Sequence, residues 1–303
     1  MAFADVLARA VGSTREVRPR GSMSLTNVAY VLALTWANPT LDRLEDQALV
    51  PMFGQNPVEL GLAGLENELI ARLGAVGRYP ELFRAAFPEA SEPLTIANIA
   101  RALAAFQRTL VSFDAPYDRA LRGESAAMSA SALRGEALFS SERFQCFRCH
   151  VPPFFTSAVD HEGLAAPDVR FFNNGLYNID GTGGYPPSNE GVSAHTGRAS
   201  DLGLFRAPTL RNLVVTAPYM HDGSLETLEH VLDHYAAGSR TIESGPFRGI
   251  GRQHPNKSRF VNGFEATPAE RDDLIAFLEA LTDSTFLTDP GFADPWLRGV
   301  GQE

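Results

Sequence analysis

The feature that constrains this chain most is a five-residue run, Cys146-Phe147-Arg148-Cys149-His150. Its C-x-x-C-H spacing is typical of the covalent attachment of a c-type haem. The two thiols would add to the two haem vinyl groups, and the histidine that follows them would stand under the iron as an axial ligand. We therefore expect Cys146 and Cys149 to hold haem c and His150 to bind its iron.

Two other uses of a C-x-x-C pair stay open at this point: a disulfide or redox pair, and half of a zinc site. A structural zinc site needs four protein ligands, and the chain holds no cysteine besides these two. A redox pair does not require the histidine that comes directly after it. Both alternatives account for less of the motif than haem attachment does.

The chain has 303 residues, enough for two domains, and it is 44% hydrophobic. Its net charge is -10 and its basic residues form no cluster, which argues against nucleic acid and anionic membranes as partners. No apolar run reaches the length of a membrane span. Covalent haem attachment implies an extracytoplasmic compartment, most often the periplasm.

The opening residues lack the basic region and the apolar core of an export signal. A haem motif without such a signal leads us to expect that the true N-terminus is missing or lies upstream.

Hydrophobic periodicity predicts an all-α chain without strands or repeats. The segments with helical spacing are residues 22–34, 39–49, 62–73, 79–87, 96–110, 129–138, 208–215, 224–237 and 268–281. Thr95 is the expected N-cap of its helix, and Thr267-Pro268-Ala269-Glu270 is a capping box with proline at the first helical position. Residues 112–128 are expected to link two domains, 1–128 and 129–303.

The second predicted domain has the plan of a class I cytochrome c. A helix precedes the haem motif, residues 151–206 form a long wrapping segment, and a terminal helix follows. The first and last helices should cross, with Gly135 permitting their close approach.

The residue on the other side of the iron is less certain from spacing. Leu228, Val231, Leu232 and Tyr235 fall on one helical stripe, so Tyr235 should point inward. A core tyrosine with a hydrogen-bonded hydroxyl explains this spacing equally well. Met is the usual sixth ligand of electron-transfer cytochromes c, which makes Met220 the next candidate. The remaining candidates are the other histidines, His161, His195, His221, His230, His234 and His254.

Several segments together resemble the bacterial di-haem cytochrome c peroxidases, and within that family the MauG-like branch, most closely the type associated with methanobactin gene clusters, which oxidises a tryptophan in a partner protein. The matching segments run along nearly the whole chain: residues 22–25, Thr35-Trp36, residues 44–48, residues 57–61, the haem motif, the segment Arg206-Ala207-Pro208-Thr209-Leu210-Arg211-Asn212 and residues 217–224.

The resemblance implies roles for individual residues. Tyr235 lies fourteen residues after His221, where ordinary members carry a Met ligand and MauG-like members a Tyr ligand. Glu59 matches the acid-base carboxylate beside the peroxide-binding haem, and Trp36 matches the tryptophan between the two haems. Thr216 and Pro218 match positions whose carbonyls help to bind Ca²⁺. Gly21 stands where the family usually offers an Asn to that ion, which puts calcium in doubt.

The chain departs from the family in three further places. Members carry a first C-x-x-C-H, and this chain begins just past its expected position, so we expect an incomplete first cytochrome c-like domain and a second haem in the full-length protein. Ser13 stands near the position where ordinary peroxidases carry an additional His ligand. A residue other than His at this position fits the MauG-like branch. Phe144 stands where MauG has a surface tryptophan, so either the path to substrate should differ or the partner should dock elsewhere.

Three functions follow as hypotheses. The first is a di-haem oxidase in which hydrogen peroxide drives oxidation of a protein substrate or a protein electron donor. The second is a single-haem electron carrier, and the third is an inactive fragment without the peroxide-binding haem.

Overall fold

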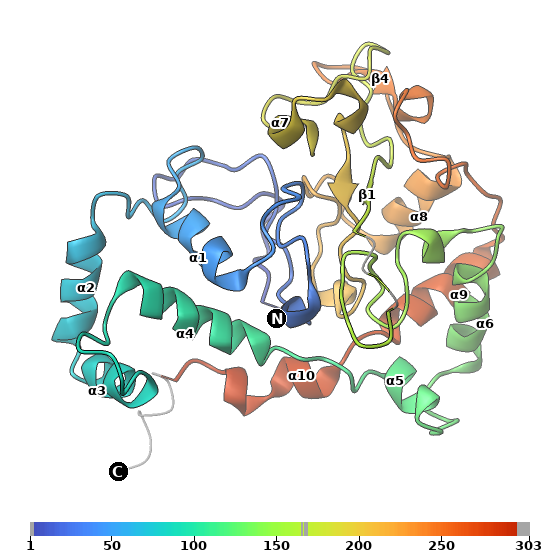
Figure 1. Ribbon diagram of the computed structural model, residues 1–303. Helices are drawn as coiled ribbons and strands as arrows, with labels where there is room; N and C mark the ends of the chain where they lie inside the picture. The colour runs from blue at the N-terminus through green and yellow to red at the C-terminus, as the bar shows by residue number, and fades with distance from the viewer. Residues whose placement is uncertain (1–2, 165, 167–168, 296–303) are drawn as a thin grey trace.

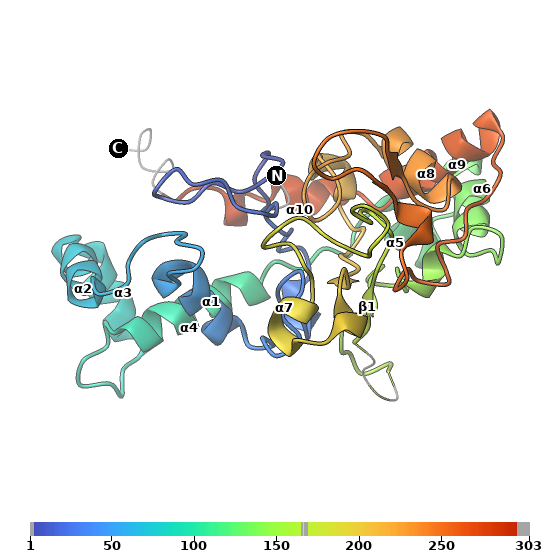
Figure 2. The same ribbon diagram turned by 90° about the horizontal axis from the view of Figure 1, so that it is seen from above.

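The computed structural model describes residues 3–164, 166 and 169–295. Two lobes lie side by side in both views of the molecule, one around α1 to α4 and the other around α6, α8 and α9 (Figures 1 and 2). The α-helices of the described residues are α1 (Leu44–Phe53), α2 (Glu66–Ala75), α3 (Arg78–Ala86), α4 (Ile96–Arg108), α5 (Pro116–Leu121), α6 (Ala130–Phe139), α7 (Ser193–Thr196), α8 (Leu228–Ala236), α9 (Pro268–Glu279) and α10 (Ser284–Thr288).

The remaining regular structure is short. Within the described residues, six 3-10 helices cover Val28–Tyr30, Cys146–Arg148, Ala199–Asp201, Leu213–Val215, Gly251–Gln253 and Pro290–Phe292. β1 (Phe171–Phe172) pairs antiparallel with β2 (Phe205–Arg206), and β3 (Thr241–Ile242) with β4 (Gly249–Ile250). The prediction of an all-α chain is confirmed in part, since the regular structure of the described residues is mostly helical, and the expectation of no strands is wrong at these two short pairs.

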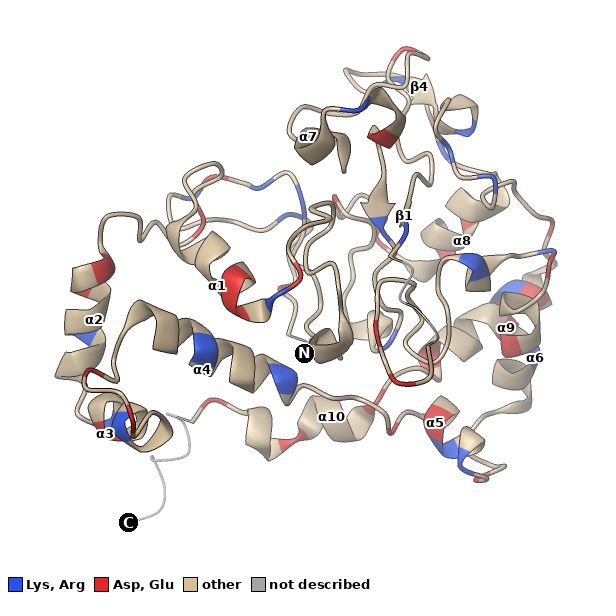
Figure 3. Ribbon diagram, in the orientation of Figure 1, with Lys and Arg blue, Asp and Glu red and all other residues tan. Residues whose placement is uncertain are grey.

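The first lobe is organised around α4. The Thr95 side chain accepts a hydrogen bond from the backbone N–H of Asn98 and so caps the helix as predicted. α4 packs on α1, where Arg108 Nη1 lies 2.8 Å from Glu45 Oε1. Figure 3 shows this acidic start of α1 beside the basic end of α4. Acidic and basic residues alternate over both lobes rather than gathering by sign.

The second lobe is organised around the crossing of α6 and α9, which make the most extensive helix–helix contact of the described fold. Ser129 caps α6, and Thr267 and Glu270 form the predicted capping box of α9. A Cβ added to Gly135 would lie 1.9 Å from the carbonyl oxygen of Asp273. The predicted close approach at Gly135 is therefore confirmed.

The helix predicted over residues 22–34 is wrong, because tertiary partners take its backbone groups. Asn27 adopts a left-handed conformation (φ 57°), and its side chain bonds to both the N–H and the carbonyl of Ser112. The Leu32 N–H donates to the carbonyl oxygen of Ala158. Only the 3-10 turn Val28–Tyr30 remains helical.

The helix predicted over residues 208–215 is also replaced by a 3-10 turn, and again an asparagine explains the change. Asn212 is fully buried with φ 59°, its Nδ2 donates to Ser112 Oγ, and its Oδ1 accepts from the N–H of Asp283. Ser112 thus connects the two buried asparagines, and this network joins the N-terminal segment, the interlobe linker and the segment after α9.

The chain after α9 returns to the first lobe, where α10 runs beside α4 (Figure 1). Phe3, Phe106, Phe286 and Phe292 form one aromatic cluster with ring centroids 5.5–6.3 Å apart. The sequence analysis did not predict α10. The division into domains at residue 128 stays a prediction. Within the part of the chain that the structure describes, no helix is both long and apolar enough to span a bilayer.

Candidate functional site

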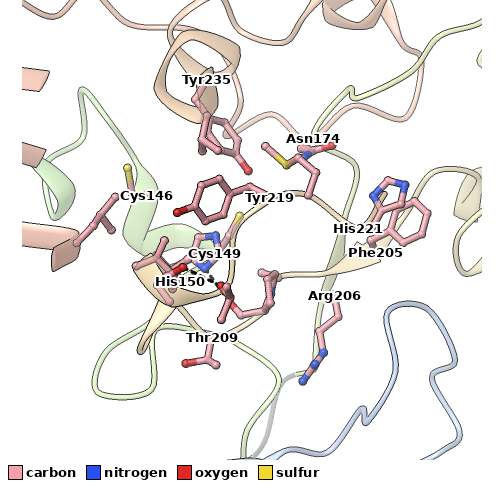
Figure 4. A pocket seen from close by; sticks show the side chains of 18 of the residues that line it. Cys146, Cys149, His150, Asn174, Phe205, Arg206, Thr209, Tyr219, His221 and Tyr235 are labelled. Atoms are coloured by element: carbon pink, nitrogen blue, oxygen red, sulfur yellow. Dashed lines mark hydrogen bonds between the residues drawn. The ribbon is translucent and has the colours of Figure 1, made fainter. Parts of the chain in front are cut away.

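A mainly apolar pocket lies beside the haem motif (Figure 4). Its volume is about 250 Å³, slightly below the ~300–1,000 Å³ typical of small-molecule sites. One wall carries Cys146, Cys149 and His150 from the turn after α6, and another carries the inward stripe of α8. β2, the segment after it and the loop before α8 also line the pocket, together with residues 21–24 of the N-terminal segment. Residues far apart in sequence therefore meet in one cavity.

The orientation of His150 is fixed by two backbone carbonyls. Its Nδ1 lies 3.1 Å from the carbonyl oxygen of Phe155 and 3.1 Å from that of Pro208. Both partners can only accept, so Nδ1 carries the hydrogen and Nε2 keeps its lone pair. Burial lowers the pKa of His150, which favours this neutral form. The imidazole is thus held as a metal ligand would be, with Nε2 available.

The two cysteines are free thiols that line the pocket (Figure 4). Burial raises the pKa of each to about 12. Among the described residues, no three His, Cys, Asp or Glu side chains group closely enough to hold a metal ion, which leaves the zinc alternative without support. The free thiols leave the disulfide alternative without support as well.

The inward stripe of α8 is present as predicted, with Leu228, Val231, Leu232 and Tyr235 all on the pocket wall. Thr227, not Ser224, caps this helix. Burial raises the pKa of Tyr235 to about 12. A hydrogen bond with Asn174 acts against this rise, and the two cysteines add to it. Tyr235 and the haem motif line the same pocket, and Figure 4 shows the Tyr235 side chain directed into it.

Other candidate ligands are engaged elsewhere. The sulfur of Met220 lies on the pocket wall and accepts a hydrogen bond from Asn174 Nδ2 at 3.3 Å. His221 stacks on Phe205 with ring centroids 3.7 Å apart. His234 Nε2 bonds to the carbonyl oxygen of Asn174.

Tyr219 and Arg206 are pocket residues to which the sequence assigned no role. Tyr219 is a second tyrosine on the wall; burial, and then the charge of Glu229, raise its pKa. Arg206 is 6% exposed, and its Nε has no hydrogen-bond partner. Burial lowers the pKa of Arg206 to about 9, so it is still charged at neutral pH. The sequence signal that could have identified Arg206 is its place at the start of the segment 206–212, which resembles the family.

These residues fit haem c. Apolar walls suit the porphyrin, two thiols suit its vinyl groups, and an imidazole with a free Nε2 suits its iron. The buried guanidinium of Arg206 lacks a carboxylate partner, and a haem carries two propionates. A buried charge without a partner is costly, so this one favours an anionic group in the pocket.

The other predicted site residues lie around this pocket to different degrees. Trp36 lines it, donates from Nε1 to the carbonyl oxygen of Gly21 at 2.9 Å, and meets the His221 ring at 6.3 Å. Thr216 and Pro218 also line it. Glu59 does not; it is half-buried, and its carbonyl accepts from the N–H of Ser13. The role of Glu59 as an acid-base carboxylate stays a prediction.

Comparison with known proteins gives consistent results. Residues 1–126 match the family model described as di-haem cytochrome c peroxidase. The chain is 36% identical over 282 residues to the methylamine utilization protein MauG of Methylorubrum extorquens, covering 93% of this chain and 69% of that protein. It is 32% identical over 227 residues to the cytochrome c551 peroxidase of Pseudomonas aeruginosa, covering 75% and 60% respectively.

Among solved structures, a MauG-like protein associated with microbial copper homeostasis superposes with a TM-score of 0.94 at 43% identity. The match covers 97% of this chain and 84% of that one. These proteins are haem-dependent oxidoreductases by name and family, in agreement with the pocket. The chain therefore belongs to the di-haem cytochrome c peroxidase and MauG family of peroxidase-type oxidoreductases.

Proposed function

We propose that Cys146 and Cys149 attach one haem c in the pocket and that His150 and Tyr235 bind its iron on opposite sides. The observation that carries this proposal is the fixed tautomer of His150, whose Nδ1 is used by two carbonyls. Tyr235 is supported by its place on the α8 stripe and by its proximity to both thiols. Arg206 would neutralise a propionate.

Tyrosinate ligation has a direct consequence for function. Ionising a phenol with a pKa of about 10 at pH 7 costs roughly 4 kcal/mol, and here burial makes it harder. Only a strongly Lewis-acidic ferric iron compensates for this cost, so the ligand favours the oxidised state. A Met ligand would instead raise the potential and suit simple electron transfer. The choice of Tyr235 therefore favours an oxidase over an electron carrier.

The function that the site supports best is peroxide-dependent oxidation of a protein side chain or of a protein electron donor. When bound, the haem supplies the one-electron redox chemistry. Trp36 lies on the pocket wall and would pass oxidising equivalents between this haem and the second haem of a di-haem enzyme. Glu59 would move a proton between the two peroxide oxygens at that second haem. Carbonyls of Thr216 and Pro218 would contribute to a Ca²⁺ site, and the protein would act in the periplasm.

The proposal can be tested with the chain produced in cells that attach haem c. Covalent haem, retained in denaturing gels, should be lost in a Cys146→Ala, Cys149→Ala double variant. In a version that carries both haems, Glu59→Gln should abolish peroxide turnover and leave the spectrum of the His150 haem intact. Unchanged turnover in that variant would refute the role of Glu59, and haem retention without the two thiols would refute the attachment site.

A further inference from the structure

A row of aromatic rings leads from the pocket wall to the molecular surface. Phe205 and His221 line the pocket, and the ring of Tyr185 lies behind them at 6.0 Å and 6.4 Å. Tyr177 follows at 5.5 Å from Tyr185, and Phe247 at 5.7 Å from Tyr177. Phe247 belongs to the β3–β4 loop and is 37% exposed.

The hydroxyls of the two tyrosines differ in their acceptors. The Tyr185 hydroxyl donates to the amide oxygen of Asn173 at 3.0 Å. An amide oxygen is a weak base and a poor proton acceptor. Tyr177 donates to Asp222 Oδ2 at 2.5 Å. Burial raises the pKa of Tyr177 to about 12, and the charge of Asp222 adds to the effect, so the phenol is protonated at rest. Asp222 already accepts the hydrogen bond of the Tyr177 hydroxyl, so it can also accept the proton of that hydroxyl.

Asp222 is prepared for that role by its neighbours. Burial alone would raise its pKa, but His221, the hydrogen bonds from Tyr177 and Ser224, and Arg240 together lower it. The carboxylate is therefore ionised at neutral pH. The Arg240 guanidinium lies 4.7 Å from the centre of the Tyr177 ring and 3.9 Å from Asp222 Oδ2. A phenol paired with an ionised, buried carboxylate can lose an electron and a proton together.

We propose that Tyr177 is a redox-active tyrosine that carries oxidising equivalents from the pocket to the surface beside Phe247, with Asp222 as its proton acceptor. Tyr177 loses one electron, which travels by way of Tyr185 and the Phe205–His221 stack to the peroxide-oxidised centre in the pocket. Its O–H bond breaks, and the proton binds Asp222 Oδ2. The products are a neutral tyrosyl radical, a neutral Asp222 and a centre reduced by one electron.

The inference rests on the proposed function for its oxidant, and the test separates the two. A version that carries both haems is mixed with hydrogen peroxide without a reductant, frozen, and examined by electron paramagnetic resonance for a tyrosyl signal. The same proteins are oxidised separately by photo-excited ruthenium tris-bipyridyl with persulfate, which needs no peroxide chemistry at the haem. Tyr117→Phe is the matched control, because Tyr117 is equally buried (6% exposed, against 7% for Tyr177) among phenylalanine rings.

We expect Tyr177→Phe to remove the signal in both experiments and Tyr117→Phe to preserve it. Asp222→Asn, whose Oδ1 can still accept from the Ser224 N–H, should reduce the signal about tenfold or more by removing the proton acceptor. Tyr185→Phe should weaken the peroxide-generated signal and spare the light-generated one, because it interrupts only the path from the pocket.

Each outcome decides one of the two ideas. A light-generated Tyr177 signal without a peroxide-generated one means that the peroxide chemistry fails while Tyr177 remains redox-active. A signal that survives Tyr177→Phe in both experiments, the absence of any signal in the parent chain, or equal losses in Tyr177→Phe and Tyr117→Phe, would overturn the inference.

Discussion

Gly135 and Asp273 bring α6 and α9 into backbone contact: a Cβ on Gly135 would lie 1.9 Å from the Asp273 carbonyl oxygen and 2.7 Å from the Cβ of Phe277. The crossing places the haem motif, which follows α6, against the core of the second lobe. Gly135→Ala should therefore separate the helices and lower the free energy of unfolding by about 1–3 kcal/mol.

Urea unfolding followed by circular dichroism measures this effect. Gly74→Ala in α2 is the matched control, because a Cβ there would meet only Leu94 Cδ2 at 3.8 Å. That variant should be neutral or more stable by up to about 1 kcal/mol. Equal effects at the two glycines would contradict the close-contact explanation.

Local signals predicted the ends of several elements well. Thr95 and Thr267 cap the helices expected of them, since each cap depends on neighbours within three residues. The α8 stripe placed Tyr235 on the pocket wall for the same local reason.

The failures concern long-range partners. Asn27 and Asn212 leave the helical conformation because both bond to Ser112, 85 and 100 residues away in sequence. Hydrophobic spacing carries no information on such partners. Arg206 was missed for a similar reason, because its burial without a carboxylate is a property of the assembled pocket.

The buried ion pair between Arg211 and Asp118 should be essential for stability. Two bonds of 2.8 Å join them, and Arg211 is fully buried. Arg211→Met would leave the Asp118 carboxylate buried and unpaired, at a cost of about 3–5 kcal/mol.

Thermal and urea unfolding would measure this cost. Arg72→Met, which breaks the exposed pair with Glu68 on α2, should cost less than about 0.5 kcal/mol. A small effect at Arg211 would show that the pair contributes little.

Replacing Arg206 should affect the stability of the haem-free chain and the midpoint potential of the haem-loaded chain. In the haem-free chain, Arg206→Leu removes an unpartnered buried charge and should leave the stability unchanged or raise it by about 1 kcal/mol. In the haem-loaded chain it should lower the midpoint potential, because a positive charge that disfavours the ferric state is lost. Arg206→Lys should retain most of the potential. A potential unaffected by Arg206→Leu would argue against a propionate partner.

The haem-loaded chain allows the identity of the tyrosine ligand to be tested directly, because the pocket holds two tyrosines, Tyr235 and Tyr219. Tyr219→Phe should leave the ferric electron paramagnetic resonance spectrum unchanged, since Tyr219 belongs to the loop before α8 and not to the α8 stripe. Tyr235→Phe should change that spectrum. The reverse result would assign the ligand to Tyr219.

The central claim is that Tyr235 binds the haem iron opposite His150, and the midpoint potential of the Tyr235→Met variant tests it most directly. Spectroelectrochemical titration compares this variant with the parent chain, with Tyr219→Met as control. We predict that Tyr235→Met raises the potential by on the order of 100 mV or more, within the ~0.8 V over which axial ligands set haem potentials, and that Tyr219→Met does not. An unchanged potential in Tyr235→Met would contradict the account.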